Sequence, residues 1–410
     1  MPECLPHAPR RRRLLAGLGV VSAAASWPGW MALGATVPTT GHAQGGGALA
    51  PGLTHPTAVR PGTRLGFPVD HGAHPDFRTE WWYATGALRT AGGGLLGFQV
   101  TFFRSRVNGH ATGVGAAKAV GRFDPRHLLF AHAALTDVAA QRQWHAQRLG
   151  RWNGDPSVRP DAASLTDTAV HLGAGAGAWS LVRQDGPAPG QSAYRATVAE
   201  PDLAFDLTLT TTQPVLLQGD GGFSRKGPDP AQASHYYSQP QLAVAGTVRH
   251  GGRPQAVTGT AWLDHEWSET LLHPDAVGWD WVGMNLDNGA ALTAFQLRRA
   301  DGSVLWAGGS WRASAHGPVQ AWAPQVLRFT PGQRWVSPLS QASYPLHWRL
   351  DTPMGPFLVR ALSPAQELDS RQSTGTVYWE GLSELVDART DQRVGLGYLE
   401  MTGYAGKLRL

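Results

Sequence analysis

The sequence predicts an all-β protein built from two tandem antiparallel β-barrels, and three observations support this fold class. Gly (51) and Pro (30) together make up about a fifth of the 410 residues, and 17 Trp are spread along the chain. After residue 50 no amphipathic helical pattern longer than two turns stands out, whereas short aromatic strands separated by Gly, Asn or Asp turns recur. One aromatic hairpin also occurs twice.

The repeated hairpin consists of a Trp-containing strand, a Gly turn and a strand with a Phe-Gln pair. Phe98-Gln99 and Phe295-Gln296 lie 197 positions apart, which indicates a duplicated unit, with chance similarity in a Trp-rich chain as the alternative. Each unit closes most simply as an antiparallel barrel, because closure removes exposed edges, and a barrel of about eight strands can hold one apolar ligand. The predicted strands and turns are 79–88, 92–94 and 95–104, then 278–286, 287–289 and 290–298.

The first 43 residues are predicted to be an export signal. Four arginines at 10–13 precede an uncharged apolar stretch that reaches Val37, and small residues at Gly41 and Ala43 suit cleavage. This pattern resembles a twin-arginine signal, so a periplasmic or secreted location is expected. A retained membrane anchor is the alternative, and Pro28 counts against it. The predicted division is a signal at 1–43, a linker at 44–64, and domains at 65–240 and 241–410.

Charge and cysteine content exclude several function classes. Beyond residue 43 the chain has 31 basic and 29 acidic residues, so a bulk attraction to nucleic acid is not expected. The single Cys4 lies within the predicted signal, upstream of its apolar stretch, which excludes disulfides, Cys-ligated zinc and cysteine nucleophiles from the mature chain. Serine-hydrolase elbows and nucleotide loops are absent, and no cofactor is predicted. No metal is predicted either, because the candidate ligands match no known spacing: His71, His74, Asp76, His265 and Glu266.

The first candidate site lies on the strand that begins the first hairpin. Strand alternation places Arg78, Glu80 and Trp82 on one face, and Tyr83 on the other. A carboxylate beside indole rings is either paired with a base or desolvated, with a raised pKa. Glu80 is therefore predicted to be either the ion-pair partner of Arg78 or a functional acid.

The second candidate site lies at 262–267, where Asp264, His265 and Glu266 follow one another inside an aromatic strand. Alternation places Asp264 and Glu266 on one face and His265 on the other, and Asp280 repeats the theme between two tryptophans. Buried ionisable groups are costly unless they are paired, hydrated or used. We therefore expect either a functional pocket or an inter-strand polar network here.

Five segments, in this order, carry a family resemblance: 77–83, 97–104, 234–238, 262–267 and 278–281. They resemble the carotenoid 1,2-hydratase (hydroxyneurosporene synthase) and AttH-like family, predicted secreted hydrolases, over roughly residues 65–405. The resemblance implies two lipocalin-like barrels. It also implies cofactor-independent addition of water to a double bond of an apolar polyene or terpenoid.

The same resemblance implies two functional pairs in the hydratases, His-x-Trp and a downstream Tyr-x-Asp. His265 and Trp267 fit the first pair. The second should fall near 292–297, where the chain has neither Tyr nor Asp. That departure counts against hydration of a carotenoid itself and leaves the expectation of a ligand-binding barrel unchanged.

Hydration of an alkene needs a neutral acid to protonate the double bond and aromatic faces to stabilise the cation. His265 would orient the water or the acid. The candidate acids are Asp264, Glu266, Asp280 and Glu80. The candidate ligand contacts are Trp82, Trp267, Trp281, Tyr237, Tyr83, Gln99 and Gln296.

The sequence thus predicts an exported two-barrel protein that binds a small apolar molecule and hydrates or hydrolyses it. A non-catalytic carrier is the alternative, and its acids would be neutralised by Arg78, Arg104 or Arg298. A third interpretation is an accessory protein that associates transiently with a membrane or a transporter. Nucleic acid is not an expected partner.

Overall fold

The computed structural model describes residues 57–107, 126–155, 161–270 and 272–408, and they fold almost wholly into antiparallel strands. The predicted signal and the first part of the predicted linker lie outside the described residues. The described helices are three short 3-10 turns, and none is long or apolar enough to cross a membrane. The all-β prediction is confirmed. The three turns are η1 (Val69–His71), η2 (Gly175–Gly177) and η3 (Pro324–Val326).

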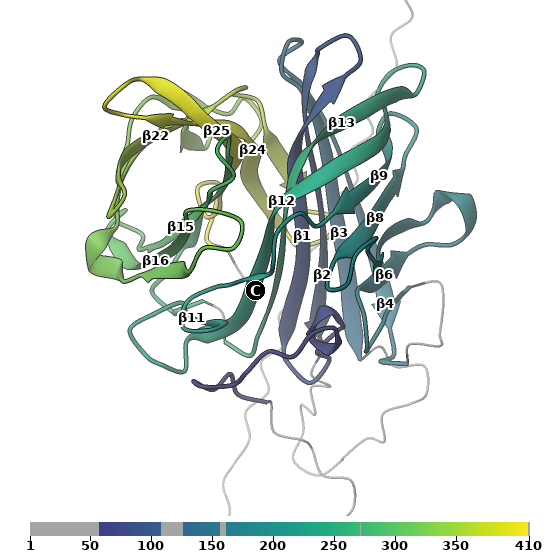
Figure 1. The fold of residues 1–410 in the computed structure, drawn as a ribbon, viewed down its shortest axis with the longest axis horizontal. Coiled ribbons are helices and arrows are strands. Elements are labelled where there is room, and N and C mark those ends of the chain that lie inside the picture. Colours follow the sequence, from purple (N-terminus) through teal and green to yellow (C-terminus); the bar gives the residue numbers. More distant parts are fainter. Residues whose placement is uncertain (1–56, 108–125, 156–160, 271, 409–410) are drawn as a thin grey trace, which may run out of the picture. The chain divides into compact units, whose positions relative to one another are not determined.

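Sheet A is a 13-stranded antiparallel sheet of the described residues that curves into a nearly closed barrel (Figure 1). Its strands are β1 (Thr79–Thr90), β2 (Leu95–Arg106), β3 (His127–Asp137), β4 (Arg142–Trp152), β5 (Ala162–Ala163), β6 (Ala169–Leu172), β7 (Trp179–Asp185), β8 (Ser192–Ala199), β9 (Ala204–Thr210), β10 (Leu216–Leu217), β11 (Phe223–Arg225), β12 (Ala233–Arg249) and β13 (Gln255–Ser268). They are ordered β4-β3-β2-β1-β13-β12-β9-β8-β7-β6-β5, with β10 and β11 also paired to β12.

Sheet B is a 10-stranded antiparallel sheet, with a separate two-stranded sheet beside it in the described chain. Its strands are β14 (Gly278–Leu286), β15 (Ala291–Arg298), β16 (Val304–Arg312), β17 (Val319–Trp322), β18 (Arg328–Pro331), β21 (His347–Thr352), β22 (Gly355–Ala361), β23 (Glu367–Ser370), β24 (Thr376–Asp387) and β25 (Gln392–Met401). They are ordered β17-β16-β15-β14-β25-β24-β22-β21-β18, with β23 paired to β24. The separate pair is β19 (Arg334–Val336) and β20 (Ser343–Pro345).

The two sheets repeat one strand order. In sheet A the run β4-β3-β2-β1 continues into β13, β12 and β9, and in sheet B the run β17-β16-β15-β14 continues into β25, β24 and β22. In sheet A the last strand, β13, pairs with the first strand, β1. In sheet B the last strand, β25, pairs with the first strand, β14. The structure is therefore consistent with two lipocalin-like barrels in tandem, as predicted.

The change of sheet falls later in the chain than the predicted boundary at 240. Both β12 and β13 belong to sheet A, so the chain leaves that sheet only between β13 and β14. Pro240 lies instead at a bulge inside β12, where the register shifts between Gln239 and Leu242 and Gln241 adopts a left-handed φ of 57°. A proline lacks the amide N–H and is tolerated in a strand at such a bulge. Pro240 therefore interrupts the pairing of β12 without ending the strand.

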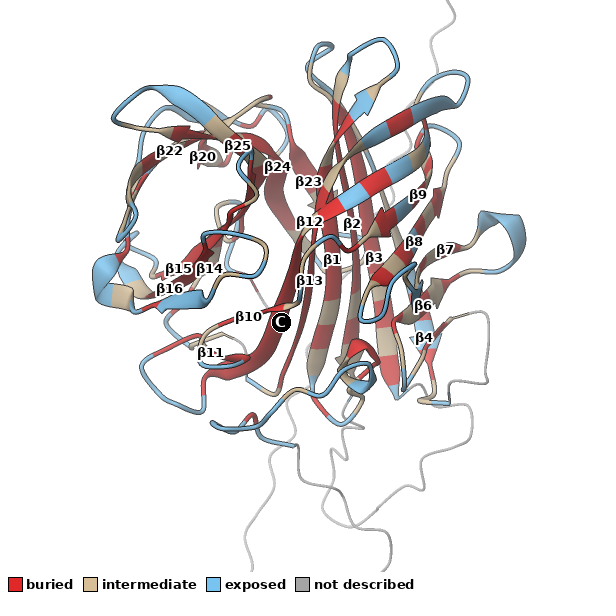
Figure 2. Ribbon diagram, viewed as in Figure 1, coloured by how far each residue is buried: buried red, intermediate tan, exposed pale blue. Residues whose placement is uncertain are grey.

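The buried side chains form a core inside each sheet and a third cluster between the sheets. The third cluster combines Tyr83 and Trp262 of sheet A with Trp281, Phe295 and Tyr398 of sheet B. Figure 2 shows long buried stretches along β12 and β24, and most residues of β14 and β15 are buried as well. These strands are covered on both faces, and the candidate site lies in the layer between the sheets.

Candidate active site

A pocket of about 280 Å³ lies between sheets A and B. Its walls come from β1, β2, β3, β12 and β13 of sheet A and from β14, β15, β24 and β25 of sheet B. Aromatic side chains line much of it, among them Trp81, Tyr83, Phe103, Tyr236, Trp281 and Phe295. Five carboxylic acids of the described residues also line it: Glu80, Asp264, Glu266 and Glu380 are buried, and Glu400 is partly buried.

Strand β13 supplies two of these acids because its side chains alternate between two faces. Asp264 and Glu266 line the pocket. His265 contacts Glu80 and Tyr237, which belong to a polar cluster on the other face of the sheet. The alternation inferred from the sequence therefore matches the structure, and it separates Asp264 and Glu266 from His265 and Trp267.

Asp264 is buried and held by three hydrogen-bond donors. The Tyr236 hydroxyl donates to Oδ2 (2.8 Å), while the Ser238 hydroxyl (2.5 Å) and Trp262 Nε1 (2.6 Å) donate to Oδ1. Burial raises the pKa of Asp264 to about 7, although these donors oppose the rise. Trp281 of sheet B, predicted to contact the ligand, donates through Nε1 to the Tyr236 hydroxyl (3.2 Å). It thereby helps to position the tyrosine that donates to Asp264.

Glu266 is paired with Lys226, the one lysine among the described residues that lines the pocket. Lys226 Nζ lies 2.9 Å from Glu266 Oε1. The same ammonium lies 4.7 Å from the centre of the Tyr236 ring and 4.4 Å from that of Phe295. Glu266 is therefore ion-paired with Lys226, whereas Asp264 has no basic partner among the described residues.

Glu380 and Glu400 lie directly opposite each other on β24 and β25. Burial and the neighbouring Glu400 charge raise the pKa of Glu380 well above its usual value. Burial also raises the pKa of Glu400 to about 7, and the charges of Asp264 and Glu266 add to the rise. Two adjacent carboxylates cannot both ionise cheaply in a buried site, so this pair retains a proton near neutral pH.

The Glu380 carboxyl is incompletely satisfied. The hydroxyls of Tyr83 and Tyr378 oppose the rise of its pKa, yet within the described structure neither Glu380 Oε1 nor the Tyr83 hydroxyl makes a hydrogen bond of ordinary geometry. Sequence reasoning missed both Glu380 and Glu400. The signal that could have found them is the one used for Asp264, an acid inside an apolar aromatic strand, here 377–382 and 396–401.

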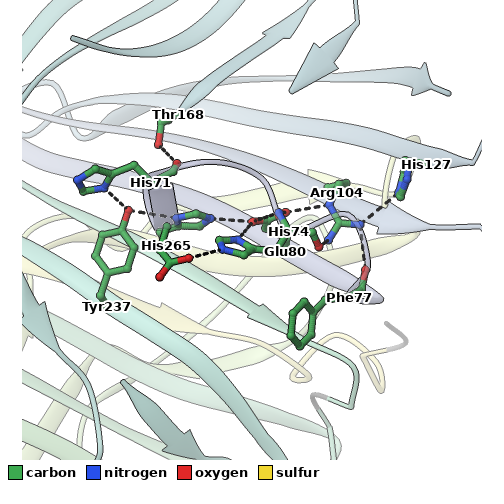
Figure 3. Close-up of polar contacts among 10 residues, drawn as sticks. His71, His74, Phe77, Glu80, Arg104, His127, Thr168, Tyr237 and His265 are labelled. Carbon is green, nitrogen blue, oxygen red and sulfur yellow. Dashed lines mark hydrogen bonds and ion pairs between the residues drawn. The ribbon is translucent and has the colours of Figure 1, made fainter. Parts of the chain in front are cut away.

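Glu80 and Arg104 also line the pocket, but Glu80 makes its polar contacts within the cluster shown in Figure 3. Its Oε2 accepts from Arg104 Nε (2.9 Å), and its Oε1 lies 2.8 Å from His74 Nδ1 and 2.9 Å from His265 Nε2. Burial alone would raise the pKa of Glu80, but Arg104, then the two histidines, hold it well below its usual value. Glu80 is thus an ionised, paired carboxylate, and its partner is Arg104 rather than Arg78.

His265 sits between this carboxylate and a tyrosine. Its Nδ1 lies 3.1 Å from the Tyr237 hydroxyl, which lies 2.8 Å from His71 Nδ1 (Figure 3). Trp82 stacks on His265, and Trp267 stacks on His74. Burial lowers the pKa of His265 to about 4, so its ring is neutral. His265, Trp82, Trp267 and Tyr237 therefore form one packed cluster and do not line the pocket.

One group of described residues has metal-ligating atoms close together. Atoms of His74, Glu80 and His265 all lie within 4.8 Å of one another. Each of these atoms already contacts another member of the cluster, and Arg104 holds the second carboxylate oxygen. This hydrogen bonding satisfies the three side chains without an ion.

The remaining predicted residues lie away from the pocket. Asp280 Oδ2 accepts from Arg298 Nε and Gln296 Nε2 (both 2.8 Å), and Oδ1 accepts from the Tyr404 hydroxyl (3.0 Å). Burial raises the pKa of Asp280, and Arg298 opposes the rise. Gln99 donates to the Thr101 hydroxyl (2.5 Å). Asp280, Gln296 and Gln99 therefore support their sheets, and Asp280 has an arginine partner as Glu80 has.

Comparison with known proteins identifies the family. The AttH-like family model matches residues 58–404. The chain belongs to the AttH-like family. A crystal structure of a protein assigned as AttH, from Nitrosomonas europaea, matches with 42% identity and a TM-score of 0.74, over 85% of this chain and 99% of that one.

A more distant structure shares the AttH-like fold. Kievitone hydratase from Nectria haematococca matches with a TM-score of 0.61 and 15% identity, over 86% of this chain and 98% of that one. At this identity the likeness concerns the fold alone. No curated protein matches the sequence.

Proposed function

We propose that this AttH-like chain is a cofactor-independent acid–base enzyme that adds water to, or removes it from, an apolar molecule held between sheets A and B. One observation carries the proposal. Three acids, the buried Asp264 and Glu380 and the partly buried Glu400, line an aromatic pocket without a basic partner among the described residues, and all three have a raised pKa. Such acids can donate a proton at neutral pH.

The reaction requires one acid, one water and a place for a cation. The Glu380–Glu400 pair would protonate one carbon of a double bond, which leaves a carbocation on the other carbon. The faces of Trp281 and Tyr83 would stabilise that charge. Water then adds to the cation and loses a proton to Asp264. Asp264 returns this proton to the acid pair, so no net proton is gained or lost.

The expected substrate is apolar, of polyene, terpenoid or lipid-like type, because aromatic and aliphatic side chains form most of the pocket wall. The shared fold with kievitone hydratase supports hydration as the reaction. Export by a twin-arginine-type signal belongs to the same proposal and rests on the arginines at 10–13 and the apolar stretch after them.

The test begins with protein purified after expression with its own N-terminal segment. Mass spectrometry of the apolar molecules extracted from it identifies the ligand. Incubation of that ligand with the protein in heavy-oxygen water should give a product that contains the heavy oxygen. Glu380→Gln, Glu400→Gln and Asp264→Asn should each lower this turnover about a hundredfold or more.

Glu384→Gln is the matched control, because Glu384 lies on the same strand β24 but pairs with Arg360 outside the pocket. Its turnover should equal that of the wild type. If a bound ligand is recovered but no heavy oxygen enters it with any variant, the protein is a carrier and the catalytic proposal is wrong.

A further inference from the structure

Among the described residues that line the pocket, acidic side chains outnumber arginine and lysine. Among its described lining residues, Lys226 is paired with Glu266 and the Arg104 guanidinium with Glu80. Burial lowers the pKa of His132, which also lines the pocket, to about 3, so that ring is neutral. The Glu380–Glu400 pair and Asp264 therefore have no basic partner among the described residues.

Two buried polar atoms in the pocket lack a partner in the described structure. Glu380 Oε1 and the Tyr83 hydroxyl each make no hydrogen bond, and both side chains are more than nine-tenths buried. They are close enough for the Tyr83 hydroxyl to affect the pKa of Glu380. A buried acceptor without a donor is unfavourable, so a ligand that supplies N–H donors here removes that cost.

The aromatic wall already holds one ammonium group. Lys226 Nζ lies over the rings of Tyr236 and Phe295, at 4.7 and 4.4 Å from their centres. Ammonium groups are attracted to the negative faces of aromatic rings, most strongly where water is excluded. Trp81, Trp279 and Trp281 offer further faces in the same pocket.

We infer that the pocket binds an apolar molecule that carries a protonated amine, with its N–H groups donated to Glu380 Oε1 and the Tyr83 hydroxyl. The inference rests on the proposed function for the location of the ligand, but it concerns ligand charge and not turnover. The ligand enters as the ammonium and pairs with the Glu380 carboxylate, while the one proton that the acid pair retains stays on Glu400.

The test compares three probes with the same ten-carbon chain: decylamine, decanol and decanoate. Binding to the full-length protein is followed by quenching of tryptophan fluorescence and by calorimetry below the micellar concentrations. Decylamine should bind at least about tenfold more tightly than decanol, and decanoate should bind most weakly. Equal binding of decylamine and decanol, or no binding of any probe, overturns the inference.

Variants locate the ammonium. Glu380→Gln should reduce the preference for decylamine over decanol to about twofold or less, while decanol binding stays close to that of the wild type. Tyr83→Phe keeps the ring and should weaken decylamine alone. Glu384→Gln should retain the wild-type preference, and a loss there equal to that of Glu380→Gln would contradict the assigned position. A protein that binds decylamine as described but gives no turnover refutes the proposed function and leaves this inference standing.

Discussion

Asp264 and Glu80 are both buried carboxylic acids on the neighbouring strands β13 and β1, yet their pKa values move in opposite directions. Glu80 has Arg104 and two histidines around it, and these cations and donors outweigh the cost of burial. Asp264 has only neutral donors, so burial prevails and its pKa rises to about 7. One acid is thus held ionised, and the other has a pKa near neutral pH, as the proposed proton transfer requires.

The raised pKa of Asp264 makes folding stability depend on pH. Between about pH 4 and pH 7 the folded state holds a proton on Asp264 that the unfolded chain has lost, so the free energy of unfolding falls as pH rises. This contribution is fully present below pH 4 and is lost as pH approaches 7. Asp264→Asn should make the slope shallower by up to about 1.4 kcal/mol per pH unit, measured by urea unfolding. An unchanged slope would mean that Asp264 is already ionised at pH 4.

Side-chain partners were the least predictable feature from the sequence. Glu80 has a base two residues away in Arg78, but the structure pairs it with Arg104, which lies directly opposite it on β2. Cross-strand neighbours lie as close as residues on one strand, and only the register identifies them. For the same reason the pairing of Glu380 with Glu400 could not be predicted, because only the register of β24 and β25 places them opposite each other.

At the scale of strands, alternation was predictable and the alignment of the two hairpins was not. The faces of Asp264 and His265 follow from period-two alternation alone. The repeated hairpin predicts equivalent positions for Trp82 and Trp281. In the structure Trp82 stacks on His265 inside sheet A, whereas Trp281 lines the pocket. A shift of one residue moves a side chain to the other face of a sheet, so similar sequences gave different positions.

The close approach of β25 and β14 near the acid pair depends on a glycine. A Cβ added to Gly397 would lie 2.0 Å from the Gly283 carbonyl oxygen, and backbone cannot move aside cheaply. Gly397→Ala should lower the free energy of unfolding by about 1–3 kcal/mol in urea. Gly252→Ala, in an exposed turn with 4.0 Å to the nearest atom, should change it by less than about 0.5 kcal/mol. Similar losses in both variants would contradict the packing argument.

At the scale of the whole described unit, sheets A and B are joined by polar contacts as well as by the third core cluster. Gln241, at the bulge of β12, donates through Nε2 to the carbonyl oxygens of Leu286 (2.9 Å), at the end of β14, and of Ala290 (3.0 Å), just before β15. These contacts hold the first barrel against the first hairpin of the second. Two barrels were expected from the repeated hairpin, but their shared pocket was not, because the hairpin alone does not define which faces meet.

This contact can be tested against a residue with the same backbone conformation. Gln241→Ala should lower the free energy of unfolding by about 1–2 kcal/mol, because two hydrogen bonds between the sheets are lost, although each carbonyl oxygen keeps one backbone N–H donor. Gln341 has a similar φ of 61° but is exposed and bonds only within its own turn, so Gln341→Ala should cost less than about 0.5 kcal/mol. Thermal and urea unfolding of both variants provide the comparison, and equal losses would assign the effect to backbone strain.

The repeated strand order has a consequence for how this protein can evolve. One copy of the unit supplies Asp264 and the other supplies Glu380 and Glu400. In a symmetric pair of identical chains any mutation would appear in both halves of the cavity at once. Because the two copies are joined in one polypeptide, each half can acquire its own substitutions, so one wall of the pocket can change while the acids on the other wall are retained.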